Sequence, residues 1–491
     1  MRHATRFAAF GLIACLPVAG FAAGPVDSSA VRHASGEFAR TQPSPEESWR
    51  VPAGAAAVAK AARVTREAPR PDEVQALHQR NADGAFKRVQ IGLARALAPD
   101  GVALSAQWTK AVGGERVAQV EVRSIGAAAL RVGLDVAGLN PAIELRFGGS
   151  RSPERPLART TVAEAQRLLG DDGLYWTPST DGEVQRIEVT IPAGAEAPSA
   201  LSLPRLSHEI VDSRTPYRLP QKIGESGACN VDVVCRLNEL GPHFANARHA
   251  VAHMRFVVSG STYICTGTLV ADNDPASQVP LFHSANHCFS SNTSVPPNAT
   301  QMQTVANTLN TFWNYEATTC NGLVSAPQTQ LAGGATYLGS DHRTDGMLLR
   351  LNQTAPTIAF FAGWNAQPLA SSSAVTAIHH PSGDARMVST GQKLSEDADN
   401  HEVGWLSGTT EGGSSGSGLF TIAATGAYEL RGGLFGGAAS CANTGNLGNA
   451  GNRDYYSRLD KDFAWMSPWL LSSPNVFQNG FEATTVVTVS P

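Results

Sequence analysis

Charged residues, lysines and long apolar runs are scarce in this sequence. Asp, Glu, Lys and Arg make up only 16% of the 491 residues, against roughly 25% in typical soluble domains. The net charge of -4 excludes an overall basic surface that would bind nucleic acid. After residue 23, no apolar run approaches the roughly 20 residues that a membrane-spanning helix needs. The 47 Gly and 29 Pro are too few for a collagen-like or wholly disordered chain. We therefore expect a soluble, multidomain protein.

Residues 1–23 are predicted to be a signal peptide. Two arginines precede the apolar stretch 7–18, and small residues at 20–23 offer a cleavage site. An uncleaved anchor is disfavoured because this stretch is too short to cross a bilayer. A lipoprotein-type box ending at Cys15 is an open alternative. Either interpretation predicts a secreted protein, extracellular or periplasmic.

Cysteine is absent between Cys15 and Cys229, so the remaining thiols all lie in the C-terminal half. They are Cys229, Cys235, Cys265, Cys288, Cys320 and Cys441. An even number in an oxidising compartment predicts three disulfides, although spacing alone leaves several pairings open. No C-x-x-C pair occurs, and the adjacent His379 and His380 would point to opposite sides of a strand. We therefore expect no metal site and no cofactor.

The charge balance changes sign near the same place. Residues 1–222 hold 27 Lys and Arg against 23 Asp and Glu, whereas 223–491 hold 11 against 19. Residues 24–75, rich in Ala, Pro and Arg, show little periodicity and are expected to form a linker arm. A β-rich domain is expected from about 76 to 222. Its alternating apolar runs, separated by Gly and Pro, are 117–122, 130–136 and 187–191, and a short helix is predicted over 162–169.

The C-terminal half is predicted to be β structure as well. Short apolar runs alternate with turns rich in Gly, Ser, Asn and Thr, which is typical of a sandwich or barrel. These strand candidates are 254–258, 263–270, 347–351, 375–379 and 430–434. Residues 460–471 are predicted to form a helix that docks on the barrel, and residues 472–491 a C-terminal tail.

Three separated segments carry residue types that suit nucleophilic catalysis. Ser415 lies in the glycine- and serine-rich run 412–418, where a tight turn can bring backbone N–H groups together beside the hydroxyl. A serine needs a base, and His287 directly precedes Cys288. Asp345 precedes an apolar run. Alone, the glycine- and serine-rich run is more typical of a flexible loop than of a catalytic turn.

The order His287, Asp345, Ser415 is that of chymotrypsin-like proteases. Residues from Cys229 to about 470 resemble the lysyl endopeptidase family of secreted bacterial serine proteases. The motifs that carry the resemblance are 224–235, 312–315 before Cys320, and 377–381. It implies an all-β fold: a chymotrypsin-like double β-barrel with a C-terminal helix, preceded by a β-rich propeptide. It also implies the disulfides Cys229–Cys441, Cys235–Cys320 and Cys265–Cys288.

By the same resemblance, His287 is the general base, Asp345 orients it and Ser415 attacks the scissile carbonyl of a polypeptide substrate. The N–H groups of Gly413 and Ser415 would form the oxyanion hole. His283 and Asp341 are the nearest competitors for the first two roles. A secreted, non-catalytic binding protein that keeps a protease fold is the alternative to an enzyme.

The resemblance places Asp454 at the base of the primary pocket, where it would pair with a substrate lysine. Phe435, followed by Gly436, stands where the family has histidine, so arginine could be accepted too. The alternative for Asp454 is an exposed turn residue paired with Arg453.

Residues 24–222 would be a propeptide that is removed, leaving a protease domain at 223–471. Ser414 occupies the position where trypsin-like zymogens carry an activating Asp, so removal of an obstructing prosegment is the simplest route to activity. Lys222 at the junction would suit cleavage by the enzyme itself. A retained binding module is the alternative, and we expect a monomer whose own propeptide is a partner.

Overall fold

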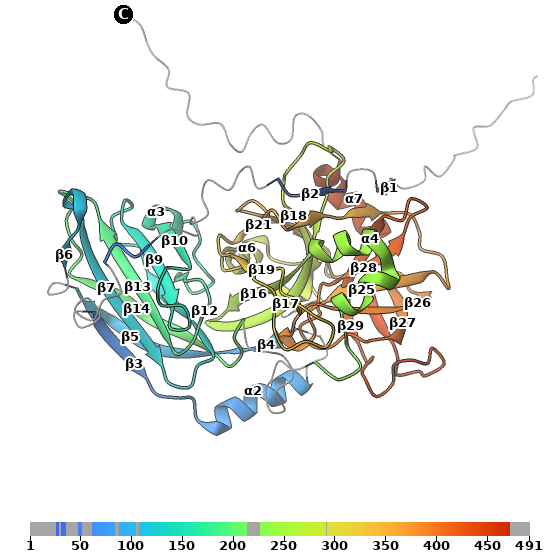
Figure 1. The fold of residues 1–491 in the computed structure, drawn as a ribbon, viewed down its shortest axis with the longest axis horizontal. Helices are drawn as coiled ribbons and strands as arrows, with labels where there is room; N and C mark the ends of the chain where they lie inside the picture. The colour runs from blue at the N-terminus through green and yellow to red at the C-terminus, as the bar shows by residue number, and fades with distance from the viewer. Residues whose placement is uncertain are drawn as a thin grey trace, which may run out of the picture.

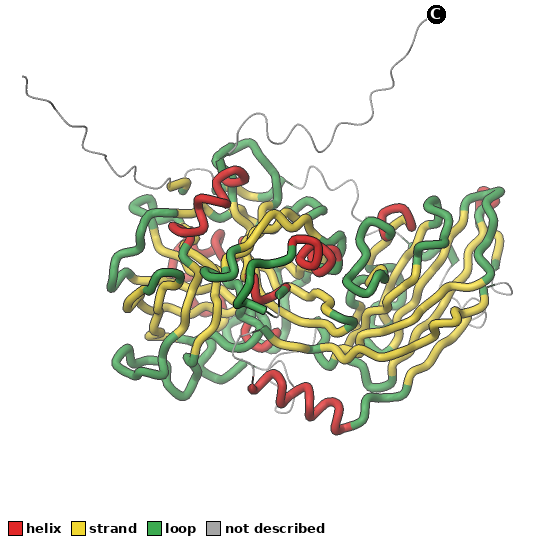
Figure 2. Tube along the Cα trace, turned by 180° about the vertical axis from the view of Figure 1, so that it is seen from behind, coloured by secondary structure: helices red, strands yellow, loops and turns green. Residues whose placement is uncertain are grey.

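The computed structural model describes residues 26–28, 31–35, 48–51, 61–83, 88–104, 108–213, 226–290 and 292–471. Figure 1 shows two β-rich parts, one running from blue to cyan-green and the other from green to red. The tube in Figure 2 shows short helices placed around a frame of strands. The expected signal peptide, the junction at Lys222 and the tail 472–491 lie outside the described residues.

The N-terminal part is a pair of sheets packed face to face. The first sheet has the order β10 (Ala158–Thr161), β9 (Glu144–Gly149), β13 (Val184–Ile191), β7 (Arg116–Ser124) and β3 (Ala62–Arg66), with β6 (Thr109–Lys110) on β7. The second has the order β11 (Tyr175–Trp176), β8 (Ala129–Asp135), β14 (Ala200–Glu209) and β5 (Gly92–Ala103), with β12 (Thr180–Asp181) on β8. Inward-facing residues such as Val120 and Phe147 from the first sheet and Leu203 from the second form one buried core. The alternating pattern of the sequence therefore gives antiparallel strands, as expected.

The helix expected over 162–169 is shorter in the structure, where α3 covers Val162–Ala165. Thr161 caps its N-terminus, and the Glu164 side chain accepts the Thr161 N–H at 2.9 Å. A β-strand precedes this capping box directly, and turns follow the helix, so only one helical turn forms.

Residues 24–75, which we expected to form a linker arm, contain regular secondary structure. They include β1 (Val26–Asp27), β2 (Arg32–His33) and β3, and the helix α2 (Pro71–Asp83) crosses the expected boundary at 75. β3 pairs in parallel with β7, and the two short strands join sheets of the C-terminal part. Strands of two residues are too short to show periodicity in a sequence, so the residue pattern did not predict β1 and β2.

The C-terminal part begins with a sheet in the order β20 (Thr329–Leu331), β19 (Asn310–Trp313), β16 (Val251–Val258), β17 (Ser261–Val270), β18 (Leu281–Ala285), β22 (Gly346–Leu351) and β21 (Ala335–Ser340). A second sheet closes into a six-stranded barrel. Its ring is β25 (Ala374–His379), β26 (Met387–Glu396), β27 (Asn400–Ser407), β30 (Asp454–Ser457), β29 (Tyr428–Gly437) and β28 (Gly418–Ile422). β15 (Val231–Asp232) pairs with β26, β23 (Phe360–Phe361) with β2, and β24 (Gly363–Asn365) with β1 and β29. This antiparallel sheet followed by a closed antiparallel barrel matches the expected all-β protease fold.

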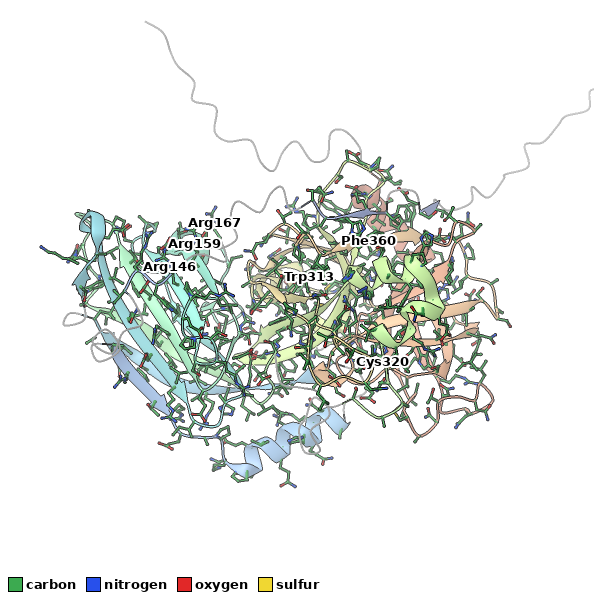
Figure 3. All side chains as sticks on the ribbon, in the orientation of Figure 1. Arg146, Arg159, Arg167, Trp313, Cys320 and Phe360 are labelled. Atoms are coloured by element: carbon green, nitrogen blue, oxygen red, sulfur yellow. A yellow bond between two sulfur atoms is a disulfide. The ribbon has the colours of Figure 1, made fainter. Side chains whose placement is uncertain are left out.

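Helices cover the ends of these sheets. They are α4 (Leu237–Ala247), α5 (Asn286–Phe289), α6 (Ala299–Asn307) and α7 (Leu459–Leu470). Helix α7 docks as expected, with Met466 and Leu470 buried and the ring of Phe463 5.4 Å from that of Trp364. Trp313, labelled in Figure 3, is fully buried in the core of the first sheet. Of the described helices, none is long and apolar enough to cross a membrane.

The two parts meet through buried polar contacts. Arg255 on β16 donates to Glu209 on β14 at 2.7 Å, and both side chains are almost completely buried. Thr262 also donates to Glu209, at 3.1 Å. Arg131, whose pKa burial lowers to about 10, donates to the Thr308 carbonyl at 2.8 Å. A hydrogen-bonded seam thus joins the N-terminal sheets to the first sheet of the C-terminal part.

Candidate active site

Ser415 sits on a tight turn that only glycine can complete. Gly413 and Gly416 have φ of +89° and +78°, a region that side chains disfavour. A Cβ on Gly416 would lie 2.2 Å from the Ser284 hydroxyl, so any larger residue would displace the neighbouring strand. Thr266 donates its N–H to the Ser415 carbonyl at 2.8 Å. This turn therefore holds Ser415 against β17.

His287 lies on α5 and is hydrogen-bonded on both ring nitrogens. Its Nδ1 is 2.6 Å from Oδ2 of Asp345, and its Nε2 is 2.7 Å from the hydroxyl of Ser415. Its backbone N–H also donates to Asp345 Oδ1 at 2.8 Å. With the proton on Nδ1 facing the carboxylate, Nε2 is left to accept the Ser415 proton. The structure thus brings together the three residues that the sequence singled out.

Asp345 is held in a left-handed backbone conformation with φ of +71°. Its N–H donates to the Asp341 carbonyl at 2.8 Å, and its carbonyl accepts from Asn286 at 2.7 Å. Burial raises the pKa of Asp345 above its ordinary value, while the hydrogen bonds from His287 oppose that rise. Such a strained residue persists only where several contacts fix it.

A second buried carboxyl, Asp462 on α7, lies behind this group. Its Oδ1 accepts hydrogen bonds from the Thr344 hydroxyl at 2.6 Å and from the indole N–H of Trp465 at 3.2 Å. Burial raises the pKa of Asp462 to about 7, and the nearby charge of Asp345 adds to the rise. The sequence analysis missed this residue because an Asp in the first turn of a helix usually stabilises the helix N-terminus from solvent.

The two competitors are placed elsewhere. His283 lies on β18, buried beside Gly433, and burial lowers its pKa to about 4. Asp341 is partly exposed and lies 3.8 Å from Arg343. Since neither hydrogen-bonds to His287 or Ser415, His287 and Asp345 remain the candidates with suitable geometry.

Ser414 belongs to a buried hydrogen-bond chain under the turn. Its hydroxyl is 2.9 Å from Nδ1 of His379, whose Nε2 is 3.0 Å from the Ser389 hydroxyl. The Ser389 hydroxyl in turn donates to the Thr409 carbonyl at 2.9 Å. This chain fixes both ends of the segment that carries the turn.

The turn that carries Ser415 has two backbone N–H groups that the sequence analysis singled out as donors. In the part of the chain that the structure describes, the N–H groups of Gly413 and Ser415 have no protein acceptor. The Ile264 side chain and the His380 carbonyl lie so close to Gly413 that a Cβ there would approach both within 3.1 Å. N–H donors held in this way can stabilise a negative charge that develops on an oxygen, without rearranging.

Asp454 is fully buried on β30, beneath the segment that leads to Ser415. Its Oδ2 accepts from the indole N–H of Trp405 at 2.7 Å and from the Thr410 hydroxyl at 2.6 Å. A Cβ on Gly437 would lie 2.4 Å from its Oδ1, so the close approach of this carboxylate to β29 requires glycine there. Arg453 pairs instead with Glu402 at 2.7 Å, and the alternative of an exposed Asp454–Arg453 pair is wrong.

Phe435 and Gly436 follow Leu434 on β29, which pairs with the strand carrying Asp454. The Phe435 ring meets the His287 imidazole edge to face, with centroids 5.9 Å apart. Phe435 therefore packs beside the His287 imidazole as an apolar side chain, and it brings no titratable group there.

The disulfides have the pairing that the resemblance implies: Cys229–Cys441, Cys235–Cys320 and Cys265–Cys288. The last one joins β17 to α5 directly behind the catalytic turn. Cys265, His287 and Cys288 are close enough together to resemble a metal site. Because both sulfurs are used in a disulfide and His287 already has two partners, this group does not fit a metal.

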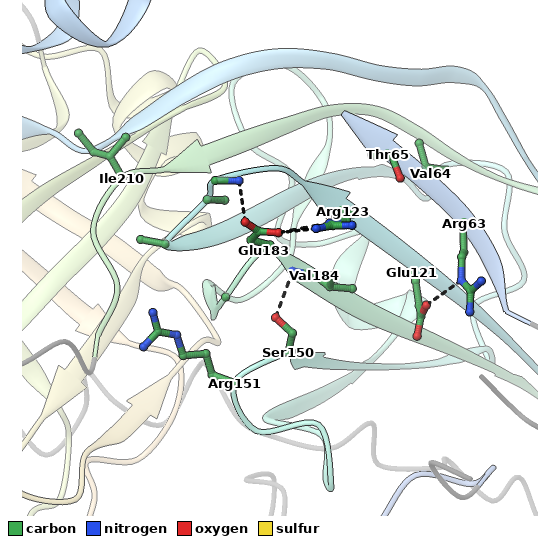
Figure 4. Close-up of a pocket in the computed structure, with 14 residues that line it drawn as sticks. Arg63, Val64, Thr65, Glu121, Arg123, Ser150, Arg151, Glu183, Val184 and Ile210 are labelled. Atoms are coloured by element: carbon green, nitrogen blue, oxygen red, sulfur yellow. Dashed lines mark hydrogen bonds and ion pairs between the residues drawn. The ribbon is translucent and has the colours of Figure 1, made fainter. Parts of the chain in front are cut away.

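Hollows elsewhere carry paired charges. A cavity of about 900 Å³ in the N-terminal part is shown in Figure 4. Along it, Arg123 pairs with Glu183 at 2.9 Å and Arg63 with Glu121 at 3.2 Å. Arg146, labelled in Figure 3, pairs with Glu144 at 2.6 Å in the same part. These partners neutralise one another, and we assign the cavity no chemistry.

Comparisons with known proteins point to one family. Residues 66–210 match the lysyl endopeptidase N-terminal domain, and residues 223–457 match the lysyl endopeptidase C-terminal domain. The chain is 35% identical over 402 residues to the lysyl endopeptidase of Pseudomonas aeruginosa, covering 78% of this chain and 82% of that protein.

Among solved structures, the thermostable serine protease AL20 from an extremophilic microorganism is 14% identical, covers 44% of this chain and 93% of its own, and has a TM-score of 0.30. Protease Anisep from Arthrobacter nicotinovorans is 15% identical, with coverages of 44% and 91% and a TM-score of 0.30. At such TM-scores the likeness carries no argument, so the fold assignment rests on the strand pairing and the family.

Proposed function

Since the chain belongs to the lysyl endopeptidase family and is a serine endopeptidase, we propose that it cuts polypeptides after lysine, and also after arginine. Ser415 is the nucleophile, His287 the general base and Asp345 the residue that orients the base. The observation that carries the proposal is the continuous hydrogen-bond chain from Asp345 through His287 to Ser415, with distances of 2.6 and 2.7 Å.

In this mechanism, His287 Nε2 takes the Ser415 proton as the hydroxyl oxygen attacks the scissile carbonyl carbon. The negative oxygen that forms is bound by the N–H groups of Gly413 and Ser415, each worth about 3 kcal/mol of transition-state stabilisation. The imidazolium then gives its proton to the leaving amine, and Asp345 stabilises the positive ring. Water, activated by His287, releases the acyl group from Ser415.

Asp454 supplies the specificity for basic residues. A substrate ammonium about 4 Å from its carboxylate gains roughly 4 kcal/mol at an effective dielectric of 20, before desolvation is subtracted. The hydrogen bonds from Trp405 and Thr410 hold the carboxylate in place through Oδ2, so its charge is fixed before the substrate binds. A neutral side chain would leave this buried carboxylate without a new partner, so it would bind less well.

The enzyme is made as a secreted precursor whose residues 24–222 are removed, with Lys222 as the last residue of the released part. The three disulfides fit an oxidising compartment outside the cytoplasm. Ser414 is bonded to His379 and Glu411 and cannot take the part of an acidic activation residue. Activation by removal of the N-terminal part therefore requires no charge at this position.

Lysine and arginine anilide peptides test the proposal on purified, processed enzyme. Wild type should hydrolyse both, and a folded Ser415→Ala protein should hydrolyse neither. Thr421→Ala, on the outer end of β28, is a matched control that should keep its activity. Turnover by a folded Ser415→Ala protein at the wild-type rate would overturn the triad.

A further inference from the structure

A short strand of the N-terminal part lies against the first sheet of the C-terminal part, at β17. β4 (Val89–Gln90) pairs antiparallel with β17, Val89 opposite Ile264 and Gln90 opposite Tyr263. The Ile91 N–H extends the contact by donating to the Thr262 carbonyl at 2.9 Å. Val89, Ile91 and Ile264 together form a small buried cluster. The strand is therefore bound by backbone pairing and by apolar contact, as an extended peptide is.

The place of this pairing on β17 is next to the nucleophile. Ile264 precedes Cys265 and Thr266, and Thr266 binds the Ser415 backbone. The Ile264 side chain also lies beside Gly413. The register shows the direction of the bound strand, because higher residue numbers on β4 lie farther from Ser415. Residues after Arg88 thus extend away from the nucleophile in the direction of the leaving group.

Arg88 lies beside the general base itself. Its Nη1 donates to the carbonyls of His287 and Cys288 at 3.2 and 3.1 Å. Its guanidinium carbon lies 4.5 Å above the ring centroid of Tyr263, in cation–π contact. His287 must protonate the leaving amine, so the substrate residue that carries this amine has to lie next to His287. The Arg88 side chain is bound at the backbone of His287 and of Cys288.

The opposite edge of the strand is held by the helix of its own domain. The side-chain amide of Asn81 on α2 donates to the Gln90 carbonyl at 2.9 Å and accepts the Gln90 N–H at 2.9 Å. β4 is thus placed between α2 and β17, with both edges hydrogen-bonded. A strand that merely joined two domains would not need an arginine aimed at the carbonyls of the catalytic helix.

We propose that Arg88, Val89 and Gln90 occupy the leaving-group side of the substrate groove in the precursor, and that the freed groove selects arginine directly after the cut bond. The carbonyls of His287 and Cys288 and the face of Tyr263 form the pocket for this arginine, and Ile264 lines the next position. This proposal rests on the proposed function, since it takes Ser415 and His287 as the reacting groups.

The first test measures processed enzyme on internally quenched peptides that share Ala-Ala-Lys before the cut and differ only after it. Arg-Val-Gln should exceed Ala-Val-Gln in kcat/KM by about tenfold, the effect of one charge-assisted contact, and Glu-Val-Gln should be poorer still. Tyr263→Leu should reduce the preference for arginine, and Tyr263→Phe should retain it. A lysine anilide, which has no residue beyond the cut bond, is the reference substrate against which the peptide rates of each enzyme are normalised.

The second test uses the full chain with Lys222→Gln, shown by mass to be intact. On this background, Arg88→Ala with Asn81→Ala should raise hydrolysis of the Arg-Val-Gln peptide at least tenfold. Arg63→Ala, on the edge strand β3 and paired with Glu121, is the matched control and should leave the intact chain unchanged. Lys87, which precedes Arg88 in the sequence, is kept in every variant.

The outcomes separate the two proposals. Equal kcat/KM for the Arg, Ala and Glu peptides would overturn the arginine pocket, and an intact chain that stays as inactive after both substitutions would overturn the self-occupied groove. In either case normal hydrolysis of the lysine anilide leaves the proposed function standing. An enzyme that hydrolyses neither the anilide nor the peptides overturns both proposals.

Discussion

Asp454→Asn should remove most of the preference for basic residues. The amide keeps an oxygen that can accept from Trp405 and Thr410, at 2.7 and 2.6 Å in the wild type, so the fold is retained. The charge is lost, however, and with it roughly 4 kcal/mol of attraction at 4 Å and a dielectric of 20. After subtracting desolvation, about 2–3 kcal/mol remains, which corresponds to a roughly 30- to 150-fold fall in kcat/KM.

The assay compares lysine, arginine and leucine anilides on the purified variant, with unfolding in urea as the measure of stability. The lysine and arginine substrates should lose activity in parallel, while hydrolysis of the leucine substrate stays the same or rises. Asp399→Asn, a substitution of a partly exposed loop residue, is the control for the loss of one negative charge away from the site. If Asp454→Asn still favours lysine by the wild-type ratio, Asp454 is not the specificity residue.

Three further predictions concern the rest of the site. Ser415→Ala expressed alone should accumulate as the full-length precursor, as seen by N-terminal sequencing, and normal maturation without another protease would exclude self-processing. Peptide mapping should find no free thiol in the processed enzyme, and Cys265 joined to anything but Cys288 would contradict the site geometry. Because the pKa of Asp462 is raised to about 7 in the folded state, this group is neutral at pH 5 and its contribution to stability is lost as pH rises through 7. Urea unfolding on a Ser415→Ala background should therefore show stability falling by about 2–4 kcal/mol more from pH 5 to 8 than in the additional variant Asp462→Asn, and equal pH slopes would refute this.

The sequence predicted the elements whose information is local. Ser415 could be located because glycines on both sides of a serine make a particular turn, and β13 because apolar residues alternate along it. His287 and Asp345 were found through their order and flanking residues. Their hydrogen bonds depend on β18 and β22 being paired, which no local pattern specifies.

The residues that support the site could not be predicted in this way. Trp405, Thr410 and Asp454 come from separate segments and meet only because β30 pairs with both β27 and β29. The residues around Asp462 predict an exposed position in the first turn of a helix, and only the docking of α7 buries it. The strand at Val89–Gln90 is two residues long and carries no periodicity. In each case tertiary packing, and not a local preference, decides the environment.

The N-terminal part reaches beyond the sheet that it contacts through β4. Its β1 pairs with β24, and its β2 pairs with β23, so that it also holds the segment between the two barrels. Arg32 on β2 pairs with Asp272 at 2.9 Å, and Ala34 enters the core of the first barrel. Figure 1 shows these two strands near α7, along the top of the C-terminal part.

Under the proposed processing, this reach makes cutting the chain and freeing the enzyme separate events. After one cut at the junction, the released part still grips the protease domain at β1, β2, β4 and the Arg255–Glu209 pair. Hydrolysis of one bond alters none of these contacts, so the first product is a nicked, two-chain complex. Its lifetime is set by how soon the grip fails, or by further digestion of the N-terminal part. Processing as proposed would therefore be followed by a delay before activity, and the length of this delay would depend on the stability of the complex and not on the speed of the cut.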